Sequence, residues 1–370
     1  MDDQEQPPDS AMSEGATERQ RGTPGTGPPR VLIAGGYGVF GRVLAREVLA
    51  SLPVRVAIAG RDAGRLAKAC RALRAGDRVE PRVLDLHDRR AVAHVSEDCF
   101  AVACAAGPFQ TLDRELPRVV AEAGAHWLDI SDVPEWVLAI LADRALHERA
   151  LENGTAVIPG LSSVPALSGA LVRWARNRLV NPRRARVVLY IGNRNAKGPA
   201  AIESARMSGF GDPLLVDLPA GRRLAYRFAS PDDVLLRQDL GLEAEFRVAL
   251  QWSFANRIMA WLQRRPGPAR SPARTGLARV LSALAAPFSV FGSEISSLQA
   301  EVFGASGEYA RAVLTGLGQR LAVLPCVLAL EALADGGLRE RGCINPAAWL
   351  GPDDWASRLS ARGIRFDGHA

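Results

Sequence analysis

The feature that most constrains this chain is a glycine-rich loop, Gly36-Tyr37-Gly38-Val39-Phe40-Gly41, which follows a short apolar run at residues 31–34. Apolar residues recur at helical spacing over residues 40–51, so the loop stands between a predicted strand and a predicted helix. In such loops the first glycine permits a tight turn, the second lets a pyrophosphate approach, and the third lets helix and strand pack closely. The N–H groups at the helix start then bind phosphate. The loop therefore predicts a dinucleotide site, with Tyr37, Val39 and Phe40 among its residues.

The rest of the first half alternates short apolar runs with helical stretches. The predicted strands are residues 54–59, 82–84, 100–104, 127–130 and 156–158, and the predicted helices are residues 63–74, 89–95, 112–123 and 139–153. Strands separated by helices of this length form βαβ units around a parallel sheet. We therefore expect residues 30–165 to form an N-terminal Rossmann domain with a doubly wound parallel sheet.

The second half has a different pattern, with longer strands predicted at residues 186–191, 222–228, 244–252, 298–303 and 309–314. Alternation such as Phe246, Val248 and Leu250 suits a mixed or antiparallel sheet with one face toward water. The predicted fold class is thus α/β, with a second α/β domain over residues 166–317. Residues 318–370 are expected to return as helices to the first domain, and Pro325 should kink the helix at residues 318–333.

Other segments limit the class of protein. Residues 1–29 are rich in Pro, Gly and polar residues, which predicts a disordered tail without a signal peptide. Residues 263–274, rich in Pro and Arg, indicate an exposed loop. The apolar stretch at residues 277–291 indicates a core helix, with peripheral membrane contact as the alternative. No run reaches the roughly 18 uncharged apolar residues of a transmembrane segment.

Composition points to a cytoplasmic protein that acts on a small molecule. The five cysteines have no spacing typical of a disulfide framework, so free thiols in a reducing compartment are expected. The net charge is +6, but the arginines are scattered, and no nucleic-acid partner is expected. The five histidines lack metal-ligand spacing, so no metal is expected. The oligomeric state stays open, a homodimer included.

The end of the second predicted strand indicates which dinucleotide binds. An NAD site usually has an acidic residue about 20 residues after the glycine loop. Here that place holds Gly60, followed by Arg61 and Asp62. Because a guanidinium can pair with a 2′-phosphate, Arg61 favours NADP(H) over NAD(H). The alternative is a solvated Arg61 beside an Asp62 that caps the next helix.

Two further loops follow predicted strands, where ligands bind in parallel sheets. Asp85 and Leu86 could line an adenine pocket, although Asp85 could equally cap the next helix. The small residues after the fourth strand permit close approach to the nicotinamide ribose, with an ordinary strand-to-helix turn as the alternative. These residues are Ala105, Ala106, Gly107 and Pro108.

Five segments together resemble the saccharopine dehydrogenase superfamily. They are VLIAGGYGVFG, VAIAGRDAGRL, CAAGPFQ, HWLDISD and GLSSVPALSGALV, within residues 30–175, and the segment from Gly307 through INPAAWL to RGIRF is similar more loosely. The resemblance implies an N-terminal Rossmann domain, a second α/β domain with a mixed sheet, and a late helix that returns to the first domain. It also implies NAD(P)-linked redox chemistry on varied substrates, which include amino-acid adducts and, in trans-acting enoyl reductases, lipid intermediates.

Candidate catalytic carboxylates stand at the end of the fifth predicted strand. Asp129 or Asp132 could accept a proton or orient an amine, unless Asp129 braces a turn and Asp132 caps the helix near Pro134. Further polar residues could bind a substrate carboxylate or a carrier phosphate. These substrate-binding candidates are Ser131, Ser162, Ser163, Arg194 and Lys197.

Two other enzyme classes fit poorly. The spacing Gly35-x-x-Gly38-x-x-Gly41 occurs in extended short-chain dehydrogenases, but no tyrosine here has a lysine four residues later. The segment Gly160-Leu161-Ser162-Ser163-Val164 lacks the second glycine of a nucleophile elbow, so a serine cap for the helix near Pro165 is favoured. We therefore expect an NADP(H)-dependent oxidoreductase with a small substrate between its domains. The alternatives are a non-catalytic NADP-binding sensor or scaffold, and a trans-acting lipid (enoyl) reductase.

Overall fold

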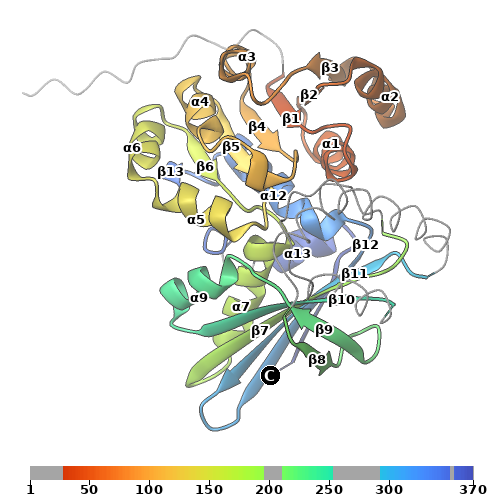
Figure 1. Cartoon of the computed structure of the whole chain (residues 1–370), viewed down its shortest axis with the longest axis vertical. Helices are drawn as coiled ribbons and strands as arrows, with labels where there is room; N and C mark the ends of the chain where they lie inside the picture. Colours follow the sequence, from red (N-terminus) through yellow and green to blue (C-terminus); the bar gives the residue numbers. More distant parts are fainter. Residues whose placement is uncertain (1–27, 196–210, 253–291, 351–353, 370) are drawn as a thin grey trace, which may run out of the picture.

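Two seven-stranded sheets organise the computed structural model, which describes residues 28–195, 211–252, 292–350 and 354–369 (Figure 1). Several predictions fall outside these ranges: the tail up to residue 27, the loop at residues 263–274, the apolar stretch at residues 277–291, and Lys197.

Sheet A is parallel throughout, with the strand order β13-β6-β5-β4-β1-β2-β3. After β3 the chain crosses to the other side of β1, so the strand order reverses between β1 and β4. The predicted doubly wound sheet is confirmed. Its strands are β1 Arg30–Ala34, β2 Arg55–Gly60, β3 Val79–Val83, β4 Ala101–Cys104, β5 His126–Asp129, β6 Ala156–Ile158 and β13 Gly342–Cys343.

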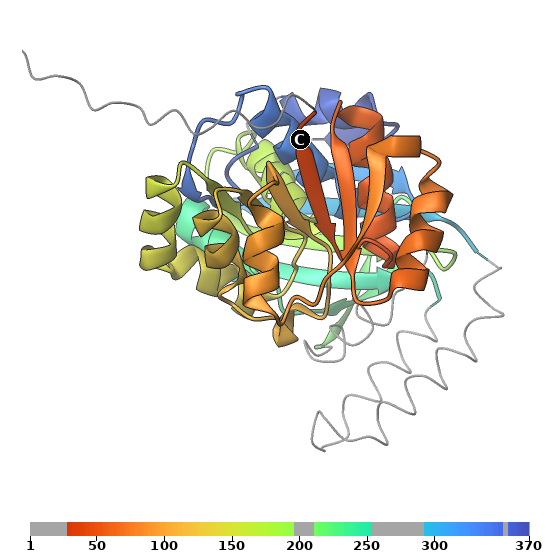
Figure 2. The same cartoon turned by 90° about the horizontal axis from the view of Figure 1, so that it is seen from above.

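Helices pack in two groups around sheet A (Figure 2). One group is α1 Val39–Ser51, α2 Ala63–Leu73 and α12 Leu324–Ala334; the other is α3 Arg89–Ser96, α4 Leu116–Glu122 and α6 Arg144–Glu152. Cover on both faces explains why the central strands are continuous apolar runs rather than alternating ones.

Two of the predicted helices have different bounds in the structure. The helix predicted at residues 139–153 is two helices, α5 Pro134–Ala142 and α6. Asp143 separates them because its side chain accepts a hydrogen bond from the Leu146 N–H at 2.9 Å and so caps α6. The helix predicted from residue 112 begins only at Leu116, after a short 3-10 turn at Phe109–Thr111.

Sheet B is mixed, as predicted, with the order β14-β12-β11-β7-β10-β9-β8. Strands β7 and β10 are parallel, and their other neighbours in the sheet are antiparallel. The bounds are β7 Pro182–Ile191, β8 Pro213–Val216, β9 Arg223–Arg227, β10 Glu243–Leu250, β11 Ile295–Gly304, β12 Tyr309–Leu317 and β14 Arg365–His369. One face packs against α7 Ser168–Arg176, α9 Asp232–Leu240 and α13 Asp354–Ser360.

The helix α12 lies between the cores of the two sheets. Val327 and Leu330 pack in the core of sheet A, whereas Leu324 and Leu328 pack in the core of sheet B. A helix that is apolar all round can be buried in this way. The predicted kink at Pro325 is wrong, because the helix begins at Leu324 and Pro325 lies in its first turn, where its missing N–H leaves no bond broken.

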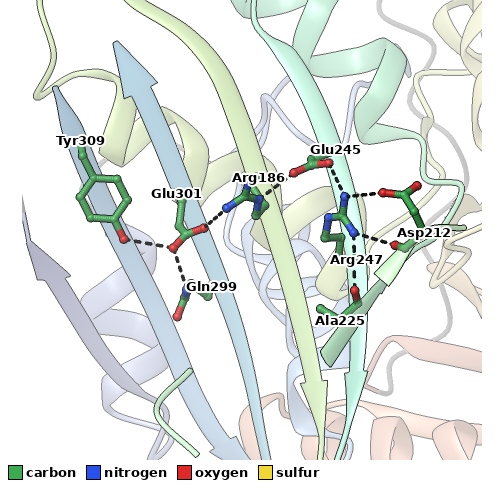
Figure 3. Close-up of polar contacts among 8 residues, drawn as sticks. All are labelled: Arg186, Asp212, Ala225, Glu245, Arg247, Gln299, Glu301 and Tyr309. Atoms are coloured by element: carbon green, nitrogen blue, oxygen red, sulfur yellow. Dashed lines mark hydrogen bonds and ion pairs between the residues drawn. The ribbon is translucent and has the colours of Figure 1, made fainter. Parts of the chain in front are cut away.

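The other face of sheet B carries a network of charged side chains that crosses neighbouring strands (Figure 3). Arg186 on β7 binds Glu245 on β10 at 2.6 Å and Glu301 on β11 at 3.3 Å. Arg247 binds Glu245 at 2.9 Å, and the Tyr309 hydroxyl donates to Glu301 at 3.1 Å. Gln299 and Asp212 extend the network at its two ends. These charges are therefore paired with one another inside the sheet.

Candidate functional site

The glycine loop makes its turn at Gly35 rather than at Gly36. Gly35 has a φ of +75°, and a Cβ there would lie 2.8 Å from the main chain of Ala106. Gly36 instead lets the loop lie against β2, because its Cβ would come within 2.5 Å of the Ile58 Cβ. The Gly36 N–H donates to the Ala59 carbonyl at 3.0 Å. The predicted role of Gly36 in the turn is thus corrected, and the loop is held between β2 and the loop after β4.

The start of α1 presents unused hydrogen-bond donors. Gly38 is its N-cap and supplies no side-chain acceptor. The described residues offer no hydrogen-bond partner to the N–H groups of Val39, Phe40 and Gly41. A Cβ on Gly38 would come within 3.0 Å of the Gly35 carbonyl oxygen, so a larger residue would crowd the glycine loop in front of these N–H groups. Free donors at a helix start, approached over glycine, fit a pyrophosphate group.

At the end of β2, the Tyr37 ring lies directly against Gly60, where a Cβ would overlap the ring. The Arg65 guanidinium lies over the Tyr37 ring at 4.3 Å from its centroid. Arg61 is exposed, and Asp62 accepts the Arg65 N–H at 2.9 Å as the N-cap of α2. The predicted cap at Asp62 is confirmed. Sequence reasoning missed Arg65, whose signal was a second arginine four residues after Arg61.

The loop after β3 is exposed at Asp85 and half-buried at Leu86. The alternative that Asp85 caps the next helix is wrong, since Asp85 accepts from the His87 N–H and Asp88 caps α3. Arg89 at the start of α3 binds Asp113 at 2.5 and 2.9 Å. This ion pair joins the loop after β3 to the segment after β4.

The loop after β4 contacts the glycine loop where the strand order reverses. The Ala105 N–H donates to the Ala34 carbonyl at 2.9 Å, and Ala106 lies against Gly35. Gly107 is exposed, and Pro108 is half-buried. Ligands of open parallel sheets bind at such a reversal point, outside the carboxyl ends of the strands.

Asp129 is buried, and four groups donate to its carboxylate. The Trp127 and Trp136 indole N–H groups each lie at 2.9 Å, the Gly160 N–H at 2.9 Å and the Ser131 N–H at 3.0 Å. Burial raises the pKa of Asp129, and these donors oppose that shift. The contacts support the alternative in which Asp129 braces the turn, because its oxygens are fully used.

Asp132 differs from Asp129, because solvent reaches the residue although protein surrounds it. Desolvation by the surrounding protein raises the pKa of Asp132, and its own backbone N–H opposes the shift. The predicted cap at α5 is wrong: the N-cap is Val133, whose N–H is bound by the Ser131 hydroxyl at 3.2 Å. No other described residue pairs with the Asp132 carboxylate, so it is free to meet a ligand.

The remaining substrate candidates are less exposed or already paired. Ser131 is buried within the Asp129 turn, and Ser162 and Ser163 are buried in the loop after β6. The predicted serine cap near Pro165 is wrong, since the short helix Ser163–Leu167 has no side-chain cap. Arg194 follows β7 on sheet B and pairs with Glu294 at 3.1 Å. The structure therefore brings Asp132 and the three serines to the edge of sheet A, whereas Arg194 follows a strand of sheet B.

The described ranges lack metal-binding and membrane-spanning features. They contain no cluster of three or more His, Cys, Asp or Glu side chains able to hold a metal ion. None of their helices has the length and apolar character of a membrane span. The five cysteines are free thiols, and burial raises the pKa of Cys99 to about 11.

The region of the first sheet is similar to known proteins. Residues 31–158 match the family model of the saccharopine dehydrogenase NADP binding domain. The probable mitochondrial saccharopine dehydrogenase-like oxidoreductase of Arabidopsis thaliana is 27% identical over 191 residues, which cover 47% of this chain and 42% of that protein. The chain thus matches less than half the length of this curated relative.

The fold of the whole chain also has a solved counterpart. Apo histidine-tagged saccharopine dehydrogenase (L-Glu forming) from Saccharomyces cerevisiae superposes with a TM-score of 0.63 at 12% identity, covering 92% of this chain and 100% of that chain. The resemblance seen in the sequence is confirmed: residues 31–158 match the model of the saccharopine dehydrogenase NADP binding domain, and the fold of the chain is similar to that of saccharopine dehydrogenase.

Proposed function

We propose that this chain is an NADP(H)-dependent oxidoreductase that binds its cofactor along the carboxyl edge of sheet A and a small substrate beside Asp132. The observation that carries the proposal is the set of unused N–H donors at Val39, Phe40 and Gly41, within a matched NADP binding domain. Residues 30–165 would hold the cofactor, and residues 166–317 would close the substrate site from the other side.

Each part of the cofactor has residues suited to it. The glycine loop would bind the pyrophosphate, and Arg61 would bind the 2′-phosphate. Leu86 offers apolar surface to adenine, with Asp85 beside it. The loop of Ala105 to Pro108 would lie against the nicotinamide ribose. A bound nicotinamide supplies the hydride chemistry, so the protein needs no nucleophile of its own.

Asp132 is the proposed proton donor or acceptor. Hydride transfer to or from an unsaturated substrate leaves a neighbouring atom that must gain or lose a proton. A carboxyl with a raised pKa keeps its proton to a higher pH than a free aspartate, as a general acid requires. Asp129 is unsuited to this role, because its oxygens already accept four hydrogen bonds.

Calorimetric titration of the purified protein with NADPH and with NADH tests the proposal. We expect NADPH to bind, and Arg61→Ala to weaken NADPH by about 10- to 100-fold, because a charge-assisted hydrogen bond to phosphate is lost. NADH affinity should change little. The matched control is Arg71→Ala, because Arg71 is also an exposed arginine but lies near the far end of α2. Absence of binding by either nucleotide at millimolar concentration would overturn the proposal.

Asp132→Asn separates binding from chemistry. The variant should bind NADPH as the parent does, because the Asp132 side chain interacts with its own backbone N–H and with no other described residue. With any substrate that the parent turns over, its rate should fall by about 10²- to 10⁴-fold, the usual contribution of a general acid. An unchanged rate would remove Asp132 from the mechanism while leaving cofactor binding intact.

A further inference from the structure

A three-part stack occupies the end of β2. The Tyr37 ring lies against Gly60, and the Arg65 guanidinium lies over the same ring, with its Cζ 4.3 Å from the ring centroid. A Cβ built on Gly60 would overlap the ring at Cε1 and lie 3.0 Å from Cδ1. Position 60 therefore cannot hold an acidic side chain while Tyr37 keeps this place.

The charges around this stack favour an anion. Arg61 and Arg65 are both exposed, and neither forms an ion pair with a described residue. One oxygen of the neighbouring Asp62 is engaged by the Arg65 N–H, so this carboxylate serves the helix start. A guanidinium placed over an aromatic ring is held by a cation–π contact, which uses none of its N–H donors. Two unpaired arginine side chains thus border the end of β2, beside the Tyr37 ring.

We propose that Tyr37 and Arg65 form the second half of the 2′-phosphate site, a proposal that rests on the proposed cofactor. Tyr37 excludes the carboxylate that would bind a ribose 2′-hydroxyl, and it holds the Arg65 guanidinium in place. Arg65 and Arg61 then bind the phosphomonoester from two sides. Specificity for the phosphorylated cofactor then has two sources. The Arg61 and Arg65 side chains attract the phosphate, and Tyr37 occupies the space that an acidic side chain at position 60 would need.

Binding of adenosine 2′,5′-bisphosphate and adenosine 5′-monophosphate, measured by calorimetry, tests the site without turnover. We expect Arg65→Ala to weaken the bisphosphate by about tenfold or more, since a charge-assisted bond to phosphate is lost, and to leave the monophosphate within about twofold. Tyr37→Phe keeps the ring and should change neither affinity. Tyr37→Ala should weaken the bisphosphate, because Arg65 loses its support. Arg71→Ala, about 9 Å further along α2, should have no effect.

Position 60 gives the second arm of the test. Gly60→Asp alone should weaken both NADPH and NADH, because its side chain meets the Tyr37 ring. The double variant Tyr37→Ala with Gly60→Asp makes room for the acid and should shift the NADH-to-NADPH affinity ratio toward NADH by about tenfold or more relative to Tyr37→Ala. Thermal melting of each variant checks that it is folded.

The outcomes separate the two proposals. If the parent protein binds no dinucleotide, the proposed function fails. If the parent binds NADPH but Arg65→Ala retains its affinity for the bisphosphate, the function stands and this inference is overturned. Equal losses for the bisphosphate and monophosphate would likewise overturn it, because Arg65 would then contact adenine rather than the 2′-phosphate.

Discussion

The carboxyl edge of sheet A and the charged face of sheet B use polar groups in opposite ways. At sheet A, the main chain around Gly35 and Gly38 leaves donors at the start of α1 without a described acceptor. On sheet B, Arg186 already lies between Glu245 and Glu301, and each of these side chains is less than one-fifth exposed. The difference shows where a charged ligand can be received, since donors that are already satisfied gain little from binding one.

The largest expected effect comes from breaking the close packing at the edge of sheet A. Gly35→Val should lower the free energy of unfolding by about 4 kcal/mol or more, because a positive φ and an overlap with Ala106 act together. Urea denaturation measures this loss. Gly76→Val is the control, since its φ is +59° but no atom lies within 4 Å of the added Cβ. It should cost about 1–2 kcal/mol, and equal losses at the two positions would contradict the role of the overlap.

An intermediate effect is expected from the charged face of sheet B. Arg186→Met leaves Glu245 and Glu301, whose side chains are 17% and 12% exposed, without their shared cation. The free energy of unfolding should fall by about 2–4 kcal/mol, as when one partner of a buried ion pair is removed. Arg194→Met breaks a pair whose side chains are 50% and 48% exposed and should cost less than about 1 kcal/mol. Similar losses would show that the network contributes no more than a surface pair.

The smallest effect concerns a second buried carboxyl, Asp232 at the start of α9, which contrasts with the fully bonded Asp129. Burial raises the pKa of Asp232 to about 7, and the nearby Ser168 hydroxyl only partly opposes this. Since the folded pKa lies above the unfolded one, the stabilisation from the protonated form is complete below the ordinary value of 3.8 and is lost as the pH rises through about 7.

Asp232→Asn removes this titration. The variant should match the parent below pH 3.8, and its excess in free energy of unfolding over the parent should be about 2 kcal/mol larger at pH 8 than at pH 5.5. Denaturant unfolding at the two pH values measures the difference, and the exposed Asp77→Asn serves as the control. A variant equally less stable than the parent at both pH values would show that Asp232 is not held protonated.

Most of sheet A could be predicted from the sequence, because β1, β2 and β4 to β6 are buried, largely apolar runs and the glycine spacing marks where the first of them ends. Strand β3 has the polar sequence VEPRV and is partly exposed, and the two-residue strand β13 was not predicted. Sheet B was predicted only in outline. Strand β8 is short and partly exposed, and neither it nor α9 has a pattern that separates it from a loop. Pro325 and Asp143 show a related limit of sequence-based prediction. Proline and aspartate can each stand at the start of a helix or interrupt one, and tertiary packing decides which.

Within the candidate site, residue types could be predicted but contacts could not. Asp129 and Asp132 are separated by two residues, yet only one of them meets two tryptophan indoles and two main-chain N–H groups. The stack of Tyr37 on Gly60 joins a loop after β1 to the end of β2, so no spacing along the chain announces it. Such contacts depend on how neighbouring strands are placed, which the linear pattern does not record.

In each sheet, an edge strand comes from residues 342–369. Strand β13 forms an edge of sheet A beside β6, and β14 forms an edge of sheet B beside β12. A nascent chain leaving the ribosome therefore completes neither sheet until residues 342–369 have been translated. Until then β6 and β12 each present an unpaired strand edge, which other strands can join. For this fold, protection by chaperones matters most in the period before residues 342–369 have left the ribosome.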